Sequence, residues 1–242
     1  MLMLVMRTPL LLALTLLTSV GTPSYAQCIR PESWPTEAEP EPWEGEIAAF
    51  EAADRIQPPT KGGVLFVGGS SIRLWPDLKG DFPGVNVIQR GFGGTALNLV
   101  VYYFPRVVLP YCPKLIVLYA GENDLNEGYT PDAVFEQYKK FVGIIHKSMP
   151  RTRIAFVSIK PSIARQSLIK QMKATNDLVR KYTATDAKLL YIDVFTPMLD
   201  SAGKPRDELL DTDKLHMNAR GYALWRDLLT PVVAPSAPGG AR

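Results

Sequence analysis

Five short, mostly apolar runs recur along the chain, and glycine, proline or polar residues bound each of them. Valine, isoleucine and leucine dominate these runs, which cover residues 64–67, 85–88, 115–119, 154–157 and 189–192. A continuous apolar run of four or five residues is typical of a strand that is buried on both faces, as in a parallel sheet. The pattern therefore predicts five parallel strands.

Other segments carry apolar residues at helical spacing, namely 44–56, 131–147, 168–182 and 218–229. Thr130 and Pro131 form a typical helix start, as N-cap and first helical residue. Strands that alternate with helices form a parallel sheet with helices on both faces. We therefore predict an α/β fold, a flavodoxin-like three-layer α/β/α sandwich with a five-stranded parallel sheet, over residues 44–230.

The ends of the chain differ from this domain. Residues 1–26 are typical of a secretory signal peptide, with Arg7 near the start, an apolar run and a small-residue cleavage site that ends at Ala26. Because the apolar run is shorter than the roughly 18 to 20 residues of a spanning helix, we expect cleavage and no stable membrane insertion afterwards. The protein is then exported, to the periplasm or the medium. We expect an extended arm at 27–43 and a disordered tail at 231–242.

Composition narrows the function classes. The 242 residues are 46% apolar and 21% charged, with 27 Lys plus Arg against 24 Asp plus Glu and a net charge of +3. This is ordinary for a globular domain and excludes intrinsic disorder. Basic residues form no block, so we expect no nucleic-acid partner. With only His146 and His216 present, a multi-histidine zinc site cannot be assembled, and we expect no metal.

The two cysteines, Cys28 and Cys112, allow two interpretations. Export would permit a disulfide between them. Alternatively, Cys112 is a small buried residue at a strand entrance and Cys28 is a free thiol near the terminus. The sequence does not choose between these alternatives.

Candidate chemistry follows the predicted strands. Glycine-rich or polar segments lie directly after the first three runs, at 68–71, 90–95 and 120–124, and Asp213 precedes His216 by three residues before the last helix. The carboxyl ends of parallel strands meet at one edge of the sheet, where ligands bind. We therefore expect the three strand-end segments to gather there.

Ser70 needs a base in order to attack a carbonyl carbon, and His216 oriented by Asp213 would provide one. The resulting oxyanion needs hydrogen-bond donors. The candidate donors are the backbone N–H of Ser70, one backbone N–H of the glycine-rich segment at 90–95 (the glycine loop) and the side-chain amide of Asn123. Each feature also has a structural alternative, because the serine and glycine segments form ordinary turns elsewhere and a lone histidine is often a core residue.

Other strand-end motifs do not fit the sequence. The third glycine of Gly91-Phe92-Gly93-Gly94 comes too early for a dinucleotide-binding loop, and the phosphate-binding loop lacks its lysine. Position 72 is Ile, so the Gly-x-Ser-x-Gly elbow of α/β-hydrolases is also absent.

Four blocks resemble those of the SGNH or GDSL-like hydrolases, in the family's order. These blocks are Phe66-Val67-Gly68-Gly69-Ser70, Gly91-Phe92-Gly93-Gly94, Gly121-Glu122-Asn123-Asp124 and Asp213-Lys214-Leu215-His216. The flanking residues 71–75 are similar to a subgroup related to the acetylhydrolases of platelet-activating factor. One position departs from the family, because Gly69 replaces the aspartate of Gly-Asp-Ser.

The resemblance implies the SGNH hydrolase fold and assigns roles by position. Ser70 would be the nucleophile, His216 the base and Asp213 its orienter. The oxyanion donors would be Ser70, Gly94 and Asn123, with Gly93 as the alternative to Gly94. No cofactor or metal is implied.

We expect a serine esterase that hydrolyses carboxylic esters of small acyl groups through an acyl-serine intermediate. Its substrate would be a small-molecule or polysaccharide ester, including O-acetyl groups. An acyltransferase with the same site, or a non-catalytic carbohydrate- or envelope-binding module, is the alternative. For Trp75, Tyr102 and Tyr103 we expect core packing, and for Lys160 and Arg165 a solvated loop.

Overall fold

The computed structural model describes Cys28 and residues 43–234. The predicted signal peptide at 1–26 and nearly all of the predicted arm at 27–43 lie outside the described residues. The same holds for residues 235–242 of the predicted tail.

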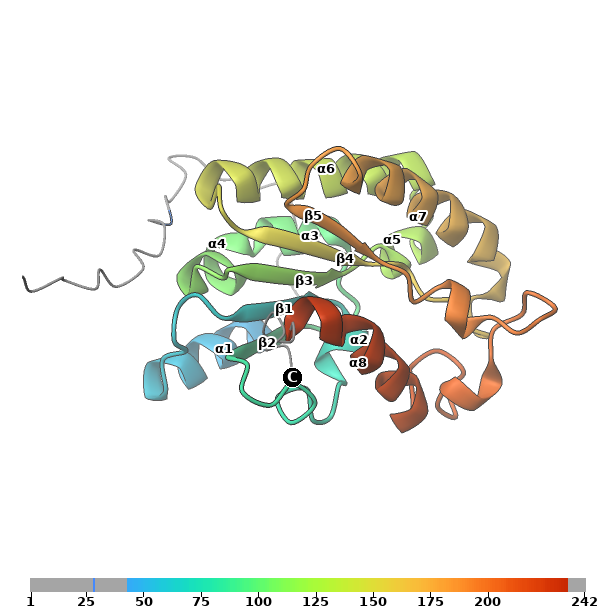
Figure 1. The fold of residues 1–242 in the computed structure, drawn as a ribbon, viewed down its shortest axis with the longest axis horizontal. Coiled ribbons are helices and arrows are strands. Elements are labelled where there is room, and N and C mark those ends of the chain that lie inside the picture. Colours follow the sequence, from blue (N-terminus) through green and yellow to red (C-terminus); the bar gives the residue numbers. More distant parts are fainter. Residues whose placement is uncertain (1–27, 29–42, 235–242) are drawn as a thin grey trace, which may run out of the picture.

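A five-stranded sheet forms the centre of the fold, and all neighbouring strands pair in parallel (Figure 1). The order is β2-β1-β3-β4-β5, with β1 at Val64–Gly68, β2 at Val87–Gly91, β3 at Leu115–Tyr119, β4 at Arg153–Val157 and β5 at Leu189–Ile192. This flavodoxin-like order reverses between β1 and β3, which is where such sheets bind ligands. The predicted fold class is confirmed.

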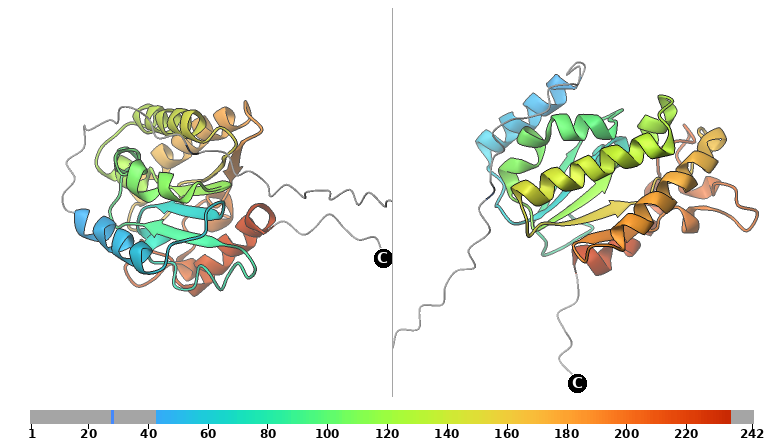
Figure 2. Two further views of the ribbon diagram at one scale, coloured as in Figure 1. Left: turned by 90° about the vertical axis from the view of Figure 1, so that its left-hand side faces the viewer. Right: turned by 90° about the horizontal axis from the view of Figure 1, so that it is seen from above.

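Helices cover both faces of the sheet (Figures 1 and 2). One face carries α1 (Glu44–Ile56), α3 (Leu97–Tyr102), α4 (Phe104–Val107), α5 (Glu122–Asn126), α6 (Pro131–Ser148) and α7 (Ile169–Thr183). The other face carries α2 (Ser70–Arg73) and α8 (Ala219–Val233). Single 3-10 turns lie at Leu109–Tyr111, Gln166–Leu168, Thr196–Met198 and Asp207–Leu209.

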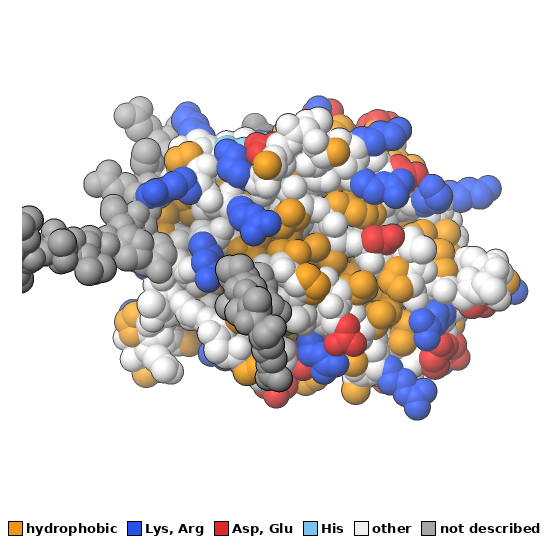
Figure 3. All heavy atoms as spheres, in the orientation of Figure 1, with side chains coloured by type: hydrophobic (Ala, Val, Ile, Leu, Met, Phe, Trp, Pro, Cys, Tyr) orange, Lys and Arg blue, Asp and Glu red, His pale blue; other side chains and the backbone are white. Residues whose placement is uncertain are grey.

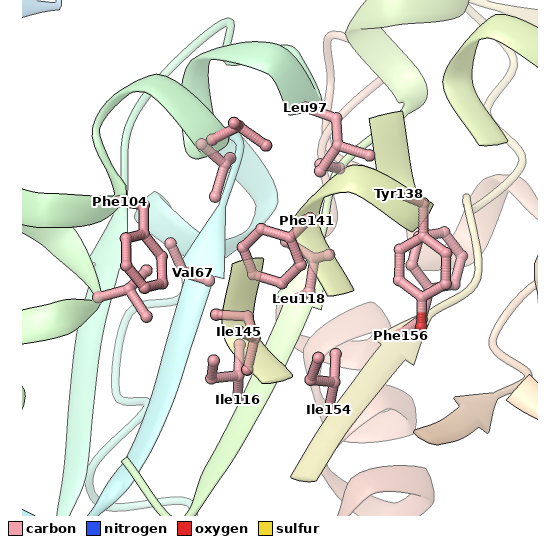
Figure 4. Close-up of a cluster of buried hydrophobic side chains, with 14 of the residues drawn as sticks. Val67, Leu97, Phe104, Ile116, Leu118, Tyr138, Phe141, Ile145, Ile154 and Phe156 are labelled. Atoms are coloured by element: carbon pink, nitrogen blue, oxygen red, sulfur yellow. The ribbon is translucent and has the colours of Figure 1, made fainter. Parts of the chain in front are cut away.

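Alternate strand residues serve two hydrophobic cores. In β1, Leu65 and Val67 belong to the core under α6, whereas Val64 and Phe66 belong to the core under α8. Figure 4 shows the first of these, in which Phe141 of α6 lies close to strand residues such as Val67 and Leu118. These side chains are fully buried, and each such burial contributes about 1.5–3 kcal/mol.

Strand β2 lies later in the chain than the apolar run at 85–88 predicted. It covers Val87–Gly91 and includes two polar residues, Gln89 and Arg90, whose side chains have partners inside the fold. The Gln89 amide donates to the carbonyls of Ile72 and Trp75, and Arg90 pairs with Asp54. Polar residues that are satisfied within the fold give no apolar signal, so the prediction placed the strand too early.

Helix boundaries agree with the sequence pattern at α1 and α6, where the Thr130 hydroxyl accepts from the Ala133 N–H as the predicted N-cap. At the other end of the domain, α8 continues through Pro231 to Val233, although a tail was predicted from 231. Leu229 and Val233, one turn apart, are both buried in the core. Their packing keeps the last turn helical despite the missing proline N–H.

Cys28 and Cys112 form a disulfide, with a Cα–Cα distance of 5.8 Å. Of the two interpretations of these cysteines, the disulfide is the one seen in the structure. It joins a residue close to the predicted cleavage site to the turn that precedes β3.

Two large aromatic side chains are core residues, as predicted. Trp75 and Tyr103 are at most 2% exposed, whereas Tyr102 packs against the core in a partly buried position. On the face drawn in Figure 3, Lys and Arg side chains are scattered and Asp and Glu lie among them, around a central apolar area.

Two glycines allow close backbone approach at the carboxyl ends of β1 and β2. Gly68 has a φ of +134°, and a Cβ there would lie 1.9 Å from the Tyr119 carbonyl oxygen. A Cβ at Gly91 would lie 2.3 Å from the Arg73 backbone nitrogen. At Gly69 the φ is −80° and the nearest atom to a Cβ would be 3.5 Å away, so an alanine would fit there.

We expect Gly68→Ala and Gly91→Ala to lower the free energy of unfolding by about 2–4 kcal/mol, because backbone atoms must shift to admit the methyl group. The control Gly69→Ala should change it by less than about 1 kcal/mol. Urea denaturation of the three variants measures this. Equal stabilities for all three would contradict the proposed close approach.

Candidate active site

A sharp turn at the end of β1 presents Ser70. The Gly69 N–H donates to the Tyr119 carbonyl at 3.0 Å, and the Phe92 N–H donates to the Gly68 carbonyl at 2.9 Å. The turn is thereby tied to the strands on both sides. Ser70 then opens α2, so its own N–H lies at a helix start and donates to no group in the described part of the chain.

The Ser70 hydroxyl lies at the end of a chain of side-chain hydrogen bonds. His216 Nε2 is 2.9 Å from Ser70 Oγ, and His216 Nδ1 is 2.5 Å from Asp213 Oδ2. The second Asp213 oxygen accepts the backbone N–H groups of Leu215 and His216, each at 2.9 Å. The three-residue spacing thus forms a tight loop in which Asp213 contacts His216 and His216 contacts Ser70.

The Asp213 carboxylate is ionised at neutral pH. Partial burial opposes ionisation, but hydrogen bonds from the His216 ring and from the backbone N–H groups of Leu215 and His216 hold the pKa of Asp213 at about 2. A carboxylate at this position favours the imidazole tautomer with the proton on Nδ1. Nε2 is then free to accept the Ser70 proton.

The glycine loop after β2 offers one unused N–H. The Gly93 N–H donates to the Glu46 carboxylate at 3.3 Å. Gly94 is exposed, has a φ of +68°, and its N–H donates to no group among the described residues. Of the two glycines considered from the sequence, Gly94 therefore has the available donor.

The Asn123 side chain is held on both sides. Its Nδ2 donates to the Thr95 carbonyl at 3.1 Å, and its Oδ1 accepts from Arg165 Nη2 at 3.0 Å. A side-chain amide has two N–H donors, so one remains for a ligand. Asn123 is the second residue of α5, two positions after Gly121, the N-cap of that helix.

A buried ionic cluster of Glu122, Lys160 and Arg165 lies beside the loops that carry Asn123 and His216. Lys160 is fully buried, with Nζ 3.0 Å from Glu122 Oε1 and 2.6 Å from the Leu215 carbonyl oxygen. Arg165 lies 3.6 Å from the same Glu122 oxygen. The expectation of a solvated loop is therefore wrong for both residues, since Lys160 is fully buried and the Arg165 side chain is only 14% exposed. The Lys160 ammonium connects the loop that carries His216 to α5.

Sequence reasoning missed this cluster because its charges looked like ordinary loop residues. A usable signal was present, since Glu122 directly precedes Asn123 and Lys160 lies three residues after the apolar run at 154–157. A buried charge needs a partner of opposite sign. An acid and a base placed after adjacent strands are candidates for such a pair.

Asp124 fixes the glycine loop at its far end. Its Oδ1 accepts the Leu97 N–H at 2.9 Å, at the start of α3. Burial raises the pKa of Asp124 to about 6, against the lowering effect of that hydrogen bond.

Two classes of feature are absent from the residues that the structure covers. Among them, no three His, Cys, Asp or Glu side chains are grouped so that they could hold a metal ion. Likewise, no helix in the described part of the chain has the length and apolar character needed to cross a membrane.

Solved structures share this fold at low sequence identity. A protein from Streptococcus pneumonia, whose name refers to platelet activating factor, superimposes with a TM-score of 0.70 at 18% identity, over 78% of this chain and 92% of its own. A GDSL-like lipase from Bacteroides thetaiotaomicron gives 0.66 at 19% identity, over 77% and 96%. An acetylxylan esterase from Geobacillus stearothermophilus gives 0.57 at 13% identity, over 73% and 96%.

No curated protein matches the sequence significantly. The family model of the GDSL-like lipase/acylhydrolases matches residues 61–224, which include all four blocks of the candidate site. The chain therefore belongs to the GDSL-like lipase/acylhydrolase family of ester-hydrolysing serine hydrolases.

Proposed function

We propose that this protein is an esterase that removes small acyl groups through an acyl-serine intermediate on Ser70. The observation that carries the proposal is the unbroken hydrogen-bond chain from Ser70 Oγ through His216 to Asp213, with distances of 2.9 and 2.5 Å. A serine hydroxyl that shares a hydrogen bond with an oriented imidazole is an activated nucleophile.

The acylation step begins when Ser70 Oγ attacks the ester carbonyl carbon and its proton passes to His216 Nε2. The tetrahedral intermediate collapses as the bond to the alcohol oxygen breaks. His216 gives its proton to that oxygen, so the alcohol leaves neutral. Asp213 keeps the ring oriented and stabilises the imidazolium that forms in between.

Deacylation repeats the sequence with water. The His216 side chain is 24% exposed, so solvent can reach the ring from outside. His216 takes a proton from water as the hydroxide oxygen attacks the acyl carbon, and then returns the proton to Ser70 Oγ. The products are a carboxylic acid and the free serine.

Three N–H groups are proposed to stabilise the negative oxygen of each tetrahedral intermediate. They are the backbone N–H groups of Ser70 and Gly94, which donate to no described group, and the second amide proton of Asn123, whose first proton bonds the Thr95 carbonyl. A donor of this kind typically contributes about 10²–10³ in kcat.

The proposed substrate is an ester of a small acyl group, such as an O-acetyl group on a polysaccharide. The acetylxylan esterase among the structural neighbours supports this choice.

Ser70→Ala and His216→Ala should each lower kcat on a short-chain aryl ester by at least about 10³-fold, because the nucleophile or its base is gone. Ser71→Ala and His146→Ala are matched controls, since Ser71 Oγ is buried with no hydrogen-bond partner among the described residues and His146 lies on α6. Steady-state kinetics and melting temperatures check this. Loss of folding in His216→Ala with kcat retained in Ser70→Ala would contradict the proposal.

Export is the second part of the proposal. The disulfide between Cys28 and Cys112 supports it, because such bonds persist in oxidising compartments. The mature protein should begin at Gln27, which the intact mass of protein recovered from the periplasm or medium measures. A full-length mass there would contradict cleavage after Ala26.

A further inference from the structure

A tryptophan outside the matched family region contacts the glycine loop. Trp43 precedes α1, and its indole Nε1 donates to the Gly93 carbonyl oxygen at 2.6 Å. The two residues are 50 positions apart in the chain. The family match begins at residue 61, so Trp43 lies outside the matched residues.

The same segment also holds the other polar group of Gly93. The Glu46 carboxylate accepts the Gly93 N–H, and Arg73 Nε lies 3.8 Å from Glu46 Oε2, which compensates the carboxylate charge. The Arg73 guanidinium also covers Gly93, where an added Cβ would meet it at 3.0 Å. Both backbone groups of Gly93 are thus fixed from outside the loop.

The orientation of the Gly93 carbonyl determines that of the Gly94 N–H. In a trans peptide the C=O and the following N–H point in opposite directions. Because Trp43 holds the carbonyl, the Gly94 N–H points away from Trp43. On the other side of this peptide, the next residue, Thr95, contacts the Asn123 amide through its carbonyl oxygen.

A peptide between two glycines has little intrinsic preference for one orientation. Glycine populates positive and negative φ about equally, so such a peptide can rotate and turn its N–H away from the site. The positive φ of Gly94 is one of these alternatives. An external hydrogen bond to the Gly93 carbonyl selects the orientation that is seen.

We propose that Trp43, assisted by Glu46, is a positioning residue that locks the Gly93–Gly94 peptide so that the Gly94 N–H faces the oxyanion. The inference rests on the proposed function. It adds that the N-terminal segment completes the oxyanion hole, although neither side chain contacts the reacting atoms.

Helix α1, which directly follows Trp43, is fixed to the rest of the domain by core packing and ion pairs. Ile47 of α1 is fully buried in the core. Arg106 of α4 pairs with Glu44 at 2.6 Å and with Glu51 at 2.7 Å, which holds the helix along its length. Trp43 therefore acts from a fixed support.

Trp43→Phe tests the lock, because it removes the N–H donor and keeps an aromatic ring. We expect kcat on a short-chain aryl ester to fall at least about tenfold with KM nearly unchanged, since the lost stabilisation occurs in the transition state. Glu46→Ala should lower kcat several-fold, whereas Glu46→Gln, which retains an acceptor oxygen, should restore most of it. Glu51→Gln is the control, because it weakens an α1 ion pair without touching Gly93.

Each outcome has a definite meaning. Should Trp43→Phe fail to fold, the test is the comparison of Glu46→Ala with Glu46→Gln. Equal kcat values for these two variants would overturn the proposed positioning role. A folded Trp43→Phe variant with wild-type kcat would overturn it directly, while Ser70-dependent hydrolysis by the wild type would leave the esterase assignment intact. Without Ser70-dependent hydrolysis in the wild type, both are overturned. A matching kcat loss in Glu51→Gln would reduce Trp43 to a general structural role.

Discussion

The parallel arrangement of the strands is the constraint on which the site depends. When five strands run the same way, the loops after them share one edge of the sheet. In this protein β1 delivers Ser70 there and β3 delivers Asn123, on either side of the point where the strand order reverses. His216 reaches the same edge from the loop before α8 and contacts Ser70 across 146 positions of sequence.

Buried charge then connects loops that the sheet alone would leave independent. Glu122 pairs with Lys160, whose ammonium also binds the Leu215 carbonyl next to His216. Arg165 joins the same carboxylate to the Asn123 amide. A buried ion pair adds little net stability compared with apolar residues of the same shape, but it fixes geometry because each charge requires its partner. The cluster therefore links the loop that carries His216 to the Asn123 side chain.

Much of this arrangement could be predicted from the sequence, because the signals were local. Apolar runs located β1, β3, β4 and β5, and the three-residue spacing of Asp213 and His216 indicated a shared loop. Strand β2 was placed too early because Gln89 and Arg90 are satisfied by distant partners. Two contacts depend on distant tertiary neighbours that no local pattern encodes: Lys160 donates to the Leu215 carbonyl 55 residues away, and Trp43 donates to the Gly93 carbonyl 50 residues away.

The central claim is that Ser70 is the activated nucleophile of the described domain. A fluorophosphonate, which reacts with activated serines, tests this most directly when labelling is followed by intact mass and peptide mapping. We expect a single adduct per chain, on Ser70 of the wild-type protein, and no adduct on folded Ser70→Ala. An unlabelled wild-type protein, or equal labelling of the two proteins, would contradict it.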